Sequence, residues 1–316
     1  NDVHDKIGKF CSASRIAAAG TSYNQIIDAQ PSHLIRMAVG LGFHRARLKY
    51  AYKLLRGKDL ETGLISDETR DKNIGIFKTA LEKVTDLNNW HSFLNLFAEA
   101  GYLNKSLVAS NYVVVFSYVL YLLGKDEYKV QPIELRKVIT RWIFMTTVTS
   151  FYSNSPESTV ERQLADLRSI KSASDFVEYL NQTIKQKMND SYFNVELIND
   201  LTSSAASSPV WYGYIASINV LGTPMLFSNT PLSKYWVLGS DGMKKAIDKH
   251  HIFPKQHLAD IGIPDDRDRN QMANFTYLDY NTNIDISDDA PSLYVGRYKA
   301  KLGDEGYAKA CAENAL

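Results

Sequence analysis

Residues 249–286 read KHHIFPKQHLADIGIPDDRDRNQMANFTYLDYNTNIDI, and this stretch differs from the rest of the chain in pattern and in chemistry. It opens with a β-prone run at residues 249–253, followed by a long polar loop around Pro264. A second strand candidate covers residues 275–278, and Asp279 suits the N-cap of a helix over residues 280–286. Strand, long loop, strand and helix in this order predict a compact ββα unit.

The first 235 residues carry helical rather than strand-like periodicity. Basic and apolar residues recur near the 3.6-residue period at 44–55, and the apolar run 112–123 is typical of a buried helix. Pro132 fits the first turn of another helix. We therefore predict a mainly α chain, with an all-α helical domain over residues 1–235 and a small ββα domain over residues 236–316.

Two serine residues predict further helix starts within this helical part. Ser158 is followed three positions later by Glu161, and Ser172 by Asp175, each ahead of an apolar run. A serine with an acidic residue at this spacing resembles a capping box. We expect helices to begin at both positions.

Composition limits the class of protein. The chain is 45% hydrophobic and 11% aromatic, which predicts a folded core. Its net charge of +1 gives no global attraction for nucleic acid, so any such contact depends on local patches. The basic run of Arg45, Arg47, Lys49 and Lys53 is one such patch, or else an ordinary solvated helix face.

The cysteines and the apolar segments indicate the compartment. The two cysteines, at positions 11 and 311, form no disulfide framework and no metal-ligand pair, which suits a reducing cytoplasm. The apolar run 112–123 is too short to cross a bilayer, and no secretory leader opens the sequence. We expect a cytoplasmic protein without a membrane partner.

A histidine cluster carries the chemistry of the C-terminal stretch. His250, His251 and His257 fall within eight residues, and a histidine pair alone is as typical of a surface strand end as of a site. Here the pair runs into Ile252-Phe253-Pro254, with Asn274 downstream and Asn283 nine residues after it. These elements, in this order and spacing, resemble the HNH (His-Me finger) endonuclease motif over about residues 245–300.

The resemblance assigns a role to each residue. It implies that His251 is the general base that deprotonates water and that Asn274 holds the loop that aims it. It also implies that His250 and Asn283 bind a divalent metal, with water and phosphate oxygens completing the coordination. Mg²⁺ is the expected ion, while the imidazole ligand also suits Mn²⁺, Ni²⁺ or Zn²⁺.

Two features of this assignment stay open at the level of sequence. Adjacent side chains of an ideal strand face opposite ways, so His250 and His251 reach one site only if the strand ends or twists there. Asp248 shares a face with His250 and competes with it as a ligand. Lys255, and Arg297 with Lys299, are candidates for phosphate contact or simply solvated cations.

A wider and weaker similarity precedes the motif. Residues 134–142, 151–153, 161–167 and 232–235 follow an order that resembles the C-terminal half of GmrSD-like type IV restriction and phosphorothioation-linked anti-phage nucleases. This resemblance implies a DNA endonuclease of bacterial defence that normally works with an N-terminal nucleotide-hydrolysing domain, whose signature is absent from this sequence. Either the sequence is a C-terminal fragment, which the missing initiator Met favours, or the chain has lost that module, whose role a partner subunit would then supply. The alternatives are a non-catalytic helical interaction module with a degenerate HNH fold, and a toxin-like nuclease that cuts RNA.

Overall fold

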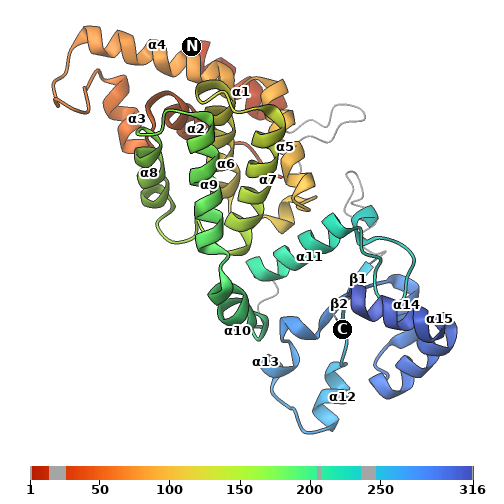
Figure 1. The fold of residues 1–316 in the computed structure, drawn as a ribbon. Helices are drawn as coiled ribbons and strands as arrows, with labels where there is room; N and C mark the ends of the chain where they lie inside the picture. Colours follow the sequence, from red (N-terminus) through yellow and green to blue (C-terminus); the bar gives the residue numbers. More distant parts are fainter. Residues whose placement is uncertain (1, 14–25, 205–207, 236–246, 315) are drawn as a thin grey trace. The chain divides into compact units, whose positions relative to one another are not determined.

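The computed structural model describes residues 2–13, 26–204, 208–235, 247–314 and 316 (Figure 1). These residues pack into two compact units, Asn1–Ala100 with Val108–Met188 and Gly101–Leu107 with Asn189–Leu316. The chain is mainly α-helical, with one small antiparallel sheet near the C-terminus, which confirms the predicted class. The domain boundary predicted after residue 235 stays a prediction, since residues 236–246 lie outside the described part.

The first unit is an all-helical bundle around an aromatic core. Trp90 lies edge-on against Tyr118 at 5.0 Å between ring centroids, and the fully buried Phe93 contacts both rings. Burial of such large apolar side chains supplies most of the stability of a helical bundle. The helices are α1 (Asp2–Ala13), α2 (Pro31–Phe43), α3 (Leu48–Leu55), α4 (Asp67–Val84), α5 (Leu87–Glu99), α6 (Asn111–Leu122), α7 (Pro132–Val148), α8 (Pro156–Leu167) and α9 (Ala173–Lys187), with a π-helical turn at Leu123–Glu127.

Several predicted helices are present as expected. The apolar run at 112–123 forms the buried helix α6, and Pro132 occupies the first turn of α7. The Ser172 side chain accepts a hydrogen bond from the Asp175 amide at the start of α9, which confirms that cap. Among the described helices, none is long and apolar enough to cross a membrane.

Two helix starts differ from the prediction. Helix α8 begins at Pro156 rather than Ser158, because proline with its fixed φ is already suited to the first turn. Helix α3 begins at Leu48 rather than near His44. His44 adopts a left-handed conformation with φ of 50° and ends α2, so the apolar periodicity continues across a break in the helix.

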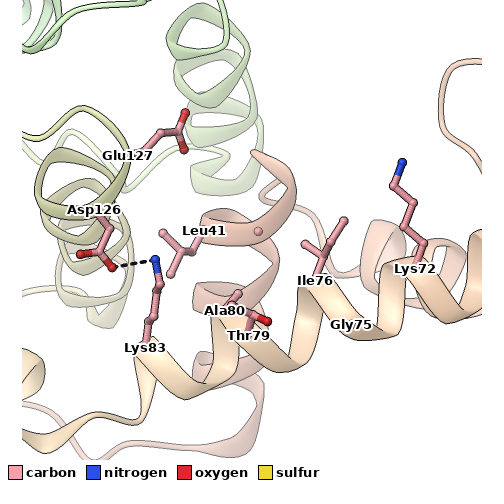
Figure 2. Close-up of a pocket in the computed structure, with 10 residues that line it drawn as sticks. Leu41, Lys72, Gly75, Ile76, Thr79, Ala80, Lys83, Asp126 and Glu127 are labelled. Atoms are coloured by element: carbon pink, nitrogen blue, oxygen red, sulfur yellow. Dashed lines mark ion pairs between the residues drawn. The ribbon is translucent and has the colours of Figure 1, made fainter.

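Polar contacts hold the end of α2, from which α3 departs. His44 Nε2 lies 2.9 Å from the Glu127 carboxylate, in the π-helical turn after α6. Lys83 of α4 forms an ion pair with the neighbouring Asp126 at 3.0 Å (Figure 2). Lys83, Asp126 and Glu127 line one side of a cavity of about 590 Å³ between α2 and α4. They tie both helices to the end of α6.

The second unit carries the sheet. Strands β1 (Ile247–His251) and β2 (Phe275–Asp279) pair antiparallel, and Trp211 of helix α11 (Pro209–Leu221) packs on the Phe275 and Tyr277 rings. Leu278 and Ile286 are buried in an apolar cluster with Tyr294 and Tyr298. The remaining helices are α10 (Leu197–Leu201), α11 (Pro209–Leu221), α12 (Lys255–Asp260), α13 (Asp266–Arg269), α14 (Tyr280–Ile286) and α15 (Pro291–Glu313), with shorter turns at Lys105–Leu107, Tyr192–Glu196, Leu232–Tyr235 and Met272–Asn274.

The ββα order is thus present, with local differences. Strand β2 and helix α14 lie where the sequence predicts them, and the Asp279 side chain caps α14 through the Thr282 amide at 2.9 Å. Strand β1 lies two residues earlier than expected. The predicted long loop between the strands contains the short helices α12 and α13.

Candidate active site at the end of the two-stranded sheet

The end of β1 places two histidines beside β2. His251 is opposite Phe275 and His250 is opposite Thr276 in the antiparallel register. His250 shares its strand face with Asp248, whereas His251 shares the other with Lys249, as strand alternation requires. The two imidazoles therefore have different neighbours, one set on each face of β1.

His250 faces helix α14. Its Nδ1 lies 2.8 Å from Asn283 Oδ1, and the Asn283 amide nitrogen donates to Asp248 Oδ2 at 3.2 Å. Because the amide nitrogen is engaged by Asp248, the amide oxygen faces His250 and accepts from Nδ1–H. His250 is 8% exposed, and its burial lowers the pKa of the imidazole. The ring is therefore neutral at neutral pH.

Asn274 fixes the chain just after β1. Its Oδ1 accepts the Phe253 amide at 2.8 Å, and its Nδ2 donates to the carbonyls of Phe253 at 2.9 Å and Arg269 at 3.1 Å. The Asn274 carbonyl also accepts the Ile252 amide at 2.8 Å. One asparagine side chain thus binds both backbone polar groups of Phe253 and holds the chain in place just after β1 ends at His251.

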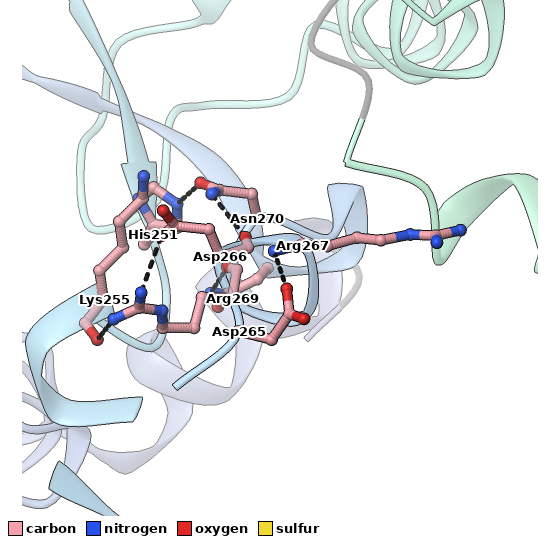
Figure 3. A network of polar contacts seen from close by, with 8 residues as sticks. His251, Lys255, Asp265, Asp266, Arg267, Arg269 and Asn270 are labelled. Atoms are coloured by element: carbon pink, nitrogen blue, oxygen red, sulfur yellow. Dashed lines mark hydrogen bonds and ion pairs between the residues drawn. The ribbon is translucent and has the colours of Figure 1, made fainter. Parts of the chain in front are cut away.

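His251 is held from the opposite direction by a residue to which the sequence assigned no role. Its Nε2 lies 3.0 Å from Asn270 Oδ1, while Asn270 Nδ2 donates to the Asp266 carbonyl at 2.7 Å (Figure 3). Since the amide nitrogen is used by Asp266, Asn270 presents an acceptor, and Nε2 of His251 must carry the hydrogen. The lone pair of the neutral ring is then on Nδ1.

Helix α13 supports this asparagine. The Arg269 guanidinium joins the Asp266 carboxylate at 2.8 Å and the Lys255 carbonyl at 3.4 Å (Figure 3). The His251 ring also packs on Phe275, with centroids 4.6 Å apart. Partial burial lowers the pKa of His251, so this imidazole too is neutral at neutral pH. The network restricts both the position and the tautomer of the ring.

Both histidines nevertheless line one cavity of about 460 Å³, together with Lys255, Asn283 and Asp288. The strand ends at His251, and the chain turns there toward Pro254 and α12. The two histidine side chains, which lie on opposite faces of β1, therefore reach the same cavity. Of the predicted residues, the structure brings His250, His251, Asn283 and Lys255 to this cavity and places Asn274 behind it.

Lys249 is a cation that the sequence reading missed. Its Nζ lies 3.9 Å from the centroid of the Phe275 ring, and it lines the His250–His251 cavity. It also lines a second cavity of about 380 Å³ on the Asn270 side, together with Arg267. Burial and the nearby Lys255 lower the pKa of Lys249. Lys249 lies two residues before His251, so strand alternation places both side chains on the same face. This spacing was the feature of the sequence that could have identified Lys249.

The other predicted phosphate contacts lie elsewhere. Arg297 forms an ion pair with Asp289 at 2.8 Å and donates to the Asp285 carbonyl at 2.9 Å. Lys299 pairs with Asp304 at 3.1 Å. Neither residue lines the cavity, so the structure gives both cations internal partners rather than a place in the site.

Within the described residues, no group of three or more His, Cys, Asp or Glu side chains is arranged to hold a metal ion. A metal at this cavity would therefore depend on His250 and Asn283, with oxygens from water and substrate. Comparison with known proteins adds no relative: no family model, no curated protein and no solved structure matches the chain.

Proposed function

We propose that this protein is a metal-dependent endonuclease of the HNH type that hydrolyses DNA phosphodiester bonds. The proposal depends on one observation: His250, His251 and Asn283 line a single cavity at the end of β1, directly after which Asn274 clamps the chain. The ββα order and the residue types agree with the motif that the sequence resembles. The similarity to GmrSD-like defence nucleases makes foreign DNA the substrate class that we propose.

His251 is the proton acceptor in this mechanism. The bond to Asn270 places the hydrogen on Nε2, so Nδ1 is the nitrogen able to take a proton from water. Positioned general bases of this kind contribute about 10²–10⁴-fold to a rate. Asn270 acts through His251, as a positioning residue, by fixing the tautomer that leaves Nδ1 free.

Two lysines supply positive charge for the phosphate. Lys249 and Lys255 line the cavity that contains both histidines, and neither forms an ion pair among the described residues. A phosphodiester carries one negative charge, and cations beside it stabilise the additional charge that develops during attack by water. The cavity thus combines a base with a cationic frame.

The donor set fits a divalent metal. His250 Nδ1 and Asn283 Oδ1, which lie 2.8 Å apart, would both offer lone pairs to an ion if the Nδ1 hydrogen of His250 moved to Nε2, a buried atom without a hydrogen-bond partner among the described residues. His250 and Asn283 would hold the ion, with Asp248 hydrogen-bonded to Asn283 and Asp288 at the cavity wall. Such an ion would polarise the phosphate and stabilise the leaving oxygen.

The test is metal-dependent nicking of supercoiled plasmid by the purified chain. His251→Ala should lower the nicking rate by about 10²–10⁴-fold with the fold retained in circular dichroism. His257→Ala is the matched control, because His257 lies on α12 and lines neither cavity. Asn270→Ala should lower the rate by about 10–100-fold, the loss seen when the hydrogen-bond partner of a metal-bound histidine is removed.

Three results would count against the proposal in different ways. Unchanged nicking by His251→Ala refutes the catalytic assignment. Cleavage of RNA in preference to DNA under the same metal refutes the substrate. A wild-type chain that cuts neither polymer with Mg²⁺, Mn²⁺, Ni²⁺ or Zn²⁺ indicates a non-catalytic module.

A further inference from the structure

Helix α3 presents a basic face in the first unit, which contains none of the residues that line the His250–His251 cavity. Residues 44–58 include six lysine and arginine side chains and no acidic one, in a chain whose net charge is only +1. Lys49, Tyr52, Lys53 and Arg56 recur at the i, i+3, i+4 and i+7 spacing of one helix face. Lys49, Tyr52 and Arg56 are exposed on this surface, which we call the α3 face.

Tyrosine rings gather the cations of this region, and only Arg45 among those named here also pairs with a carboxylate. The Tyr50 ring has Arg45 at 5.1 Å, Lys49 at 5.5 Å and Lys53 at 6.0 Å from its centroid. Tyr52 receives a 2.7 Å hydrogen bond from the Arg56 guanidinium. Like charges held this close repel one another, and a bound polyanion would relieve that repulsion.

Nearby carboxylates do not neutralise the α3 face. Glu161 pairs with Arg45 at 2.9 Å, and Glu157 pairs with Arg36. On α4, Asp67 and Asp71 both pair with Arg70. Among the described residues, Lys49, Lys53 and Arg56 are left without an ion pair. Their charge therefore faces solvent.

We propose that the α3 face binds the phosphate backbone of duplex DNA, a contact that rests on the proposed nuclease function and extends it beyond the cavity. From Lys49 to Arg56 the helix rises ~10 Å, at ~1.5 Å per residue. That length spans about three phosphate intervals of one DNA strand, at ~3.4 Å each along the axis. The contact is to phosphates and carries no sequence preference.

An anionic membrane is the competing polyanion, and the packing of α3 argues against it. A membrane-surface helix inserts its apolar face into the lipid. Here the opposite side of α3 buries Ala51 and Leu54 inside the first unit. Only the charged side is available, which suits a polyelectrolyte rather than a bilayer.

The test measures anisotropy of a short labelled DNA duplex with the full chain in EDTA, so that binding is separated from cleavage. Lys49→Gln/Lys53→Gln/Arg56→Gln should weaken binding by about tenfold or more at ~0.1 M salt, and should reduce the slope of log K against log salt by about 2.7, or ~0.9 per lost phosphate contact. The matched control is Lys72→Gln/Lys78→Gln/Lys185→Gln, which removes the same charge from exposed positions on α4 and α9 and should bind within about twofold of wild type.

Every outcome bears on the α3 face. Equal losses in both triple variants would show a general charge effect and overturn the proposal. Unchanged binding of the duplex by the α3 triple variant would also overturn it. So would an α3 variant that loses binding to phosphatidylserine vesicles but not to the duplex.

If the wild-type chain does not bind the duplex in EDTA, the proposed binding face is refuted even when the wild type nicks plasmid with metal. If the α3 loss is seen but His251→Ala nicks normally, the binding face stands and the catalytic assignment fails. The double variant Lys49→Gln/Lys53→Gln provides a second measurement if the triple variant unfolds.

Discussion

Replacing Asn274 tests whether one amide side chain fixes the chain that follows His251 at the end of β1. Asn274→Ala removes the acceptor for the Phe253 amide and the donor to the carbonyls of Phe253 and Arg269. The side chain is small and polar, so the loss is of hydrogen bonds rather than of packing. The expected result is a destabilised strand end with the rest of the second unit intact.

The magnitude follows from those three bonds. Each protein hydrogen bond contributes about 1 kcal/mol net, which sets an upper value near 3 kcal/mol. Phe253 is 47% exposed, so water replaces part of what is lost. We expect the free energy of unfolding to fall by about 2 kcal/mol, equivalent to a drop of roughly 4–8 °C in Tm.

Asn274→Asp makes the reasoning sharper. The aspartate keeps an oxygen toward the Phe253 amide but turns a second oxygen toward the carbonyls of Phe253 and Arg269, where Asn274 donates. Two acceptors then face each other at neutral pH. The aspartate variant should therefore be at least as unstable as the alanine variant, although it is closer to asparagine in shape.

Urea unfolding gives the free energies, and hydrogen exchange of the Phe253 amide reports on the local bond. Asn281→Ala is the matched control, because Asn281 is exposed on α14 and should change stability by less than about 0.5 kcal/mol. An Asn274→Ala protein with wild-type protection of Phe253 would refute the clamp. So would an Asn274→Asp protein clearly more stable than Asn274→Ala.

Three further predictions concern a cap, a titration and a metal ligand. Asp279→Ala should cost about 1 kcal/mol in urea unfolding, because Asp279 accepts from the Thr282 amide, and Asp279→Asn should recover most of it. Burial lowers the pKa of His33 below its usual value near 6.5, so the unfolded chain binds more protons and stability should fall as pH drops below about 6.5. His33→Gln, which can still bond the Gln30 amide, should flatten that part of the pH–stability curve. Mn²⁺ at ~100 times its Kd should stabilise the wild type by about 2.7 kcal/mol in thermal unfolding, and His250→Ala should abolish most of that shift.

Local signals explain which parts of the second unit the sequence could predict. Strand β2 and helix α14 are coded by neighbouring residues, an alternating run followed by an aspartate cap, and both lie where expected. Helices α12 and α13 were missed because they are only six and four residues long, too short to give a period. Their existence matters, since α13 carries the carbonyl of Asp266 that orients Asn270.

Contacts between residues that are distant in the sequence could not be predicted from local patterns, for a different reason. Asn270 stands 19 positions from His251, and nothing in its own neighbourhood marks it as the partner of that ring. The α3 face shows the same limit, because the composition of residues 44–58 was visible while the pairing of Glu161 and Glu157 with other arginines was not. Whether a charge is free depends on the folded neighbours, which the sequence does not display.

The histidine pair meets the condition that strand alternation sets for it: both side chains reach one cavity because β1 ends at His251. Alternation does send His250 and His251 to different partners, Asn283 on α14 and Asn270 beside α13. Side chains on opposite faces of a strand stay apart only while the strand continues. Strand β1 ends at His251, and Asn274 holds the chain that follows it. The two imidazoles therefore remain independently oriented by separate asparagines and still share one opening. A site of this kind needs the termination of β1 as much as it needs the histidines, which is why loss of Asn274 is expected to disturb the cavity without removing any group that lines it.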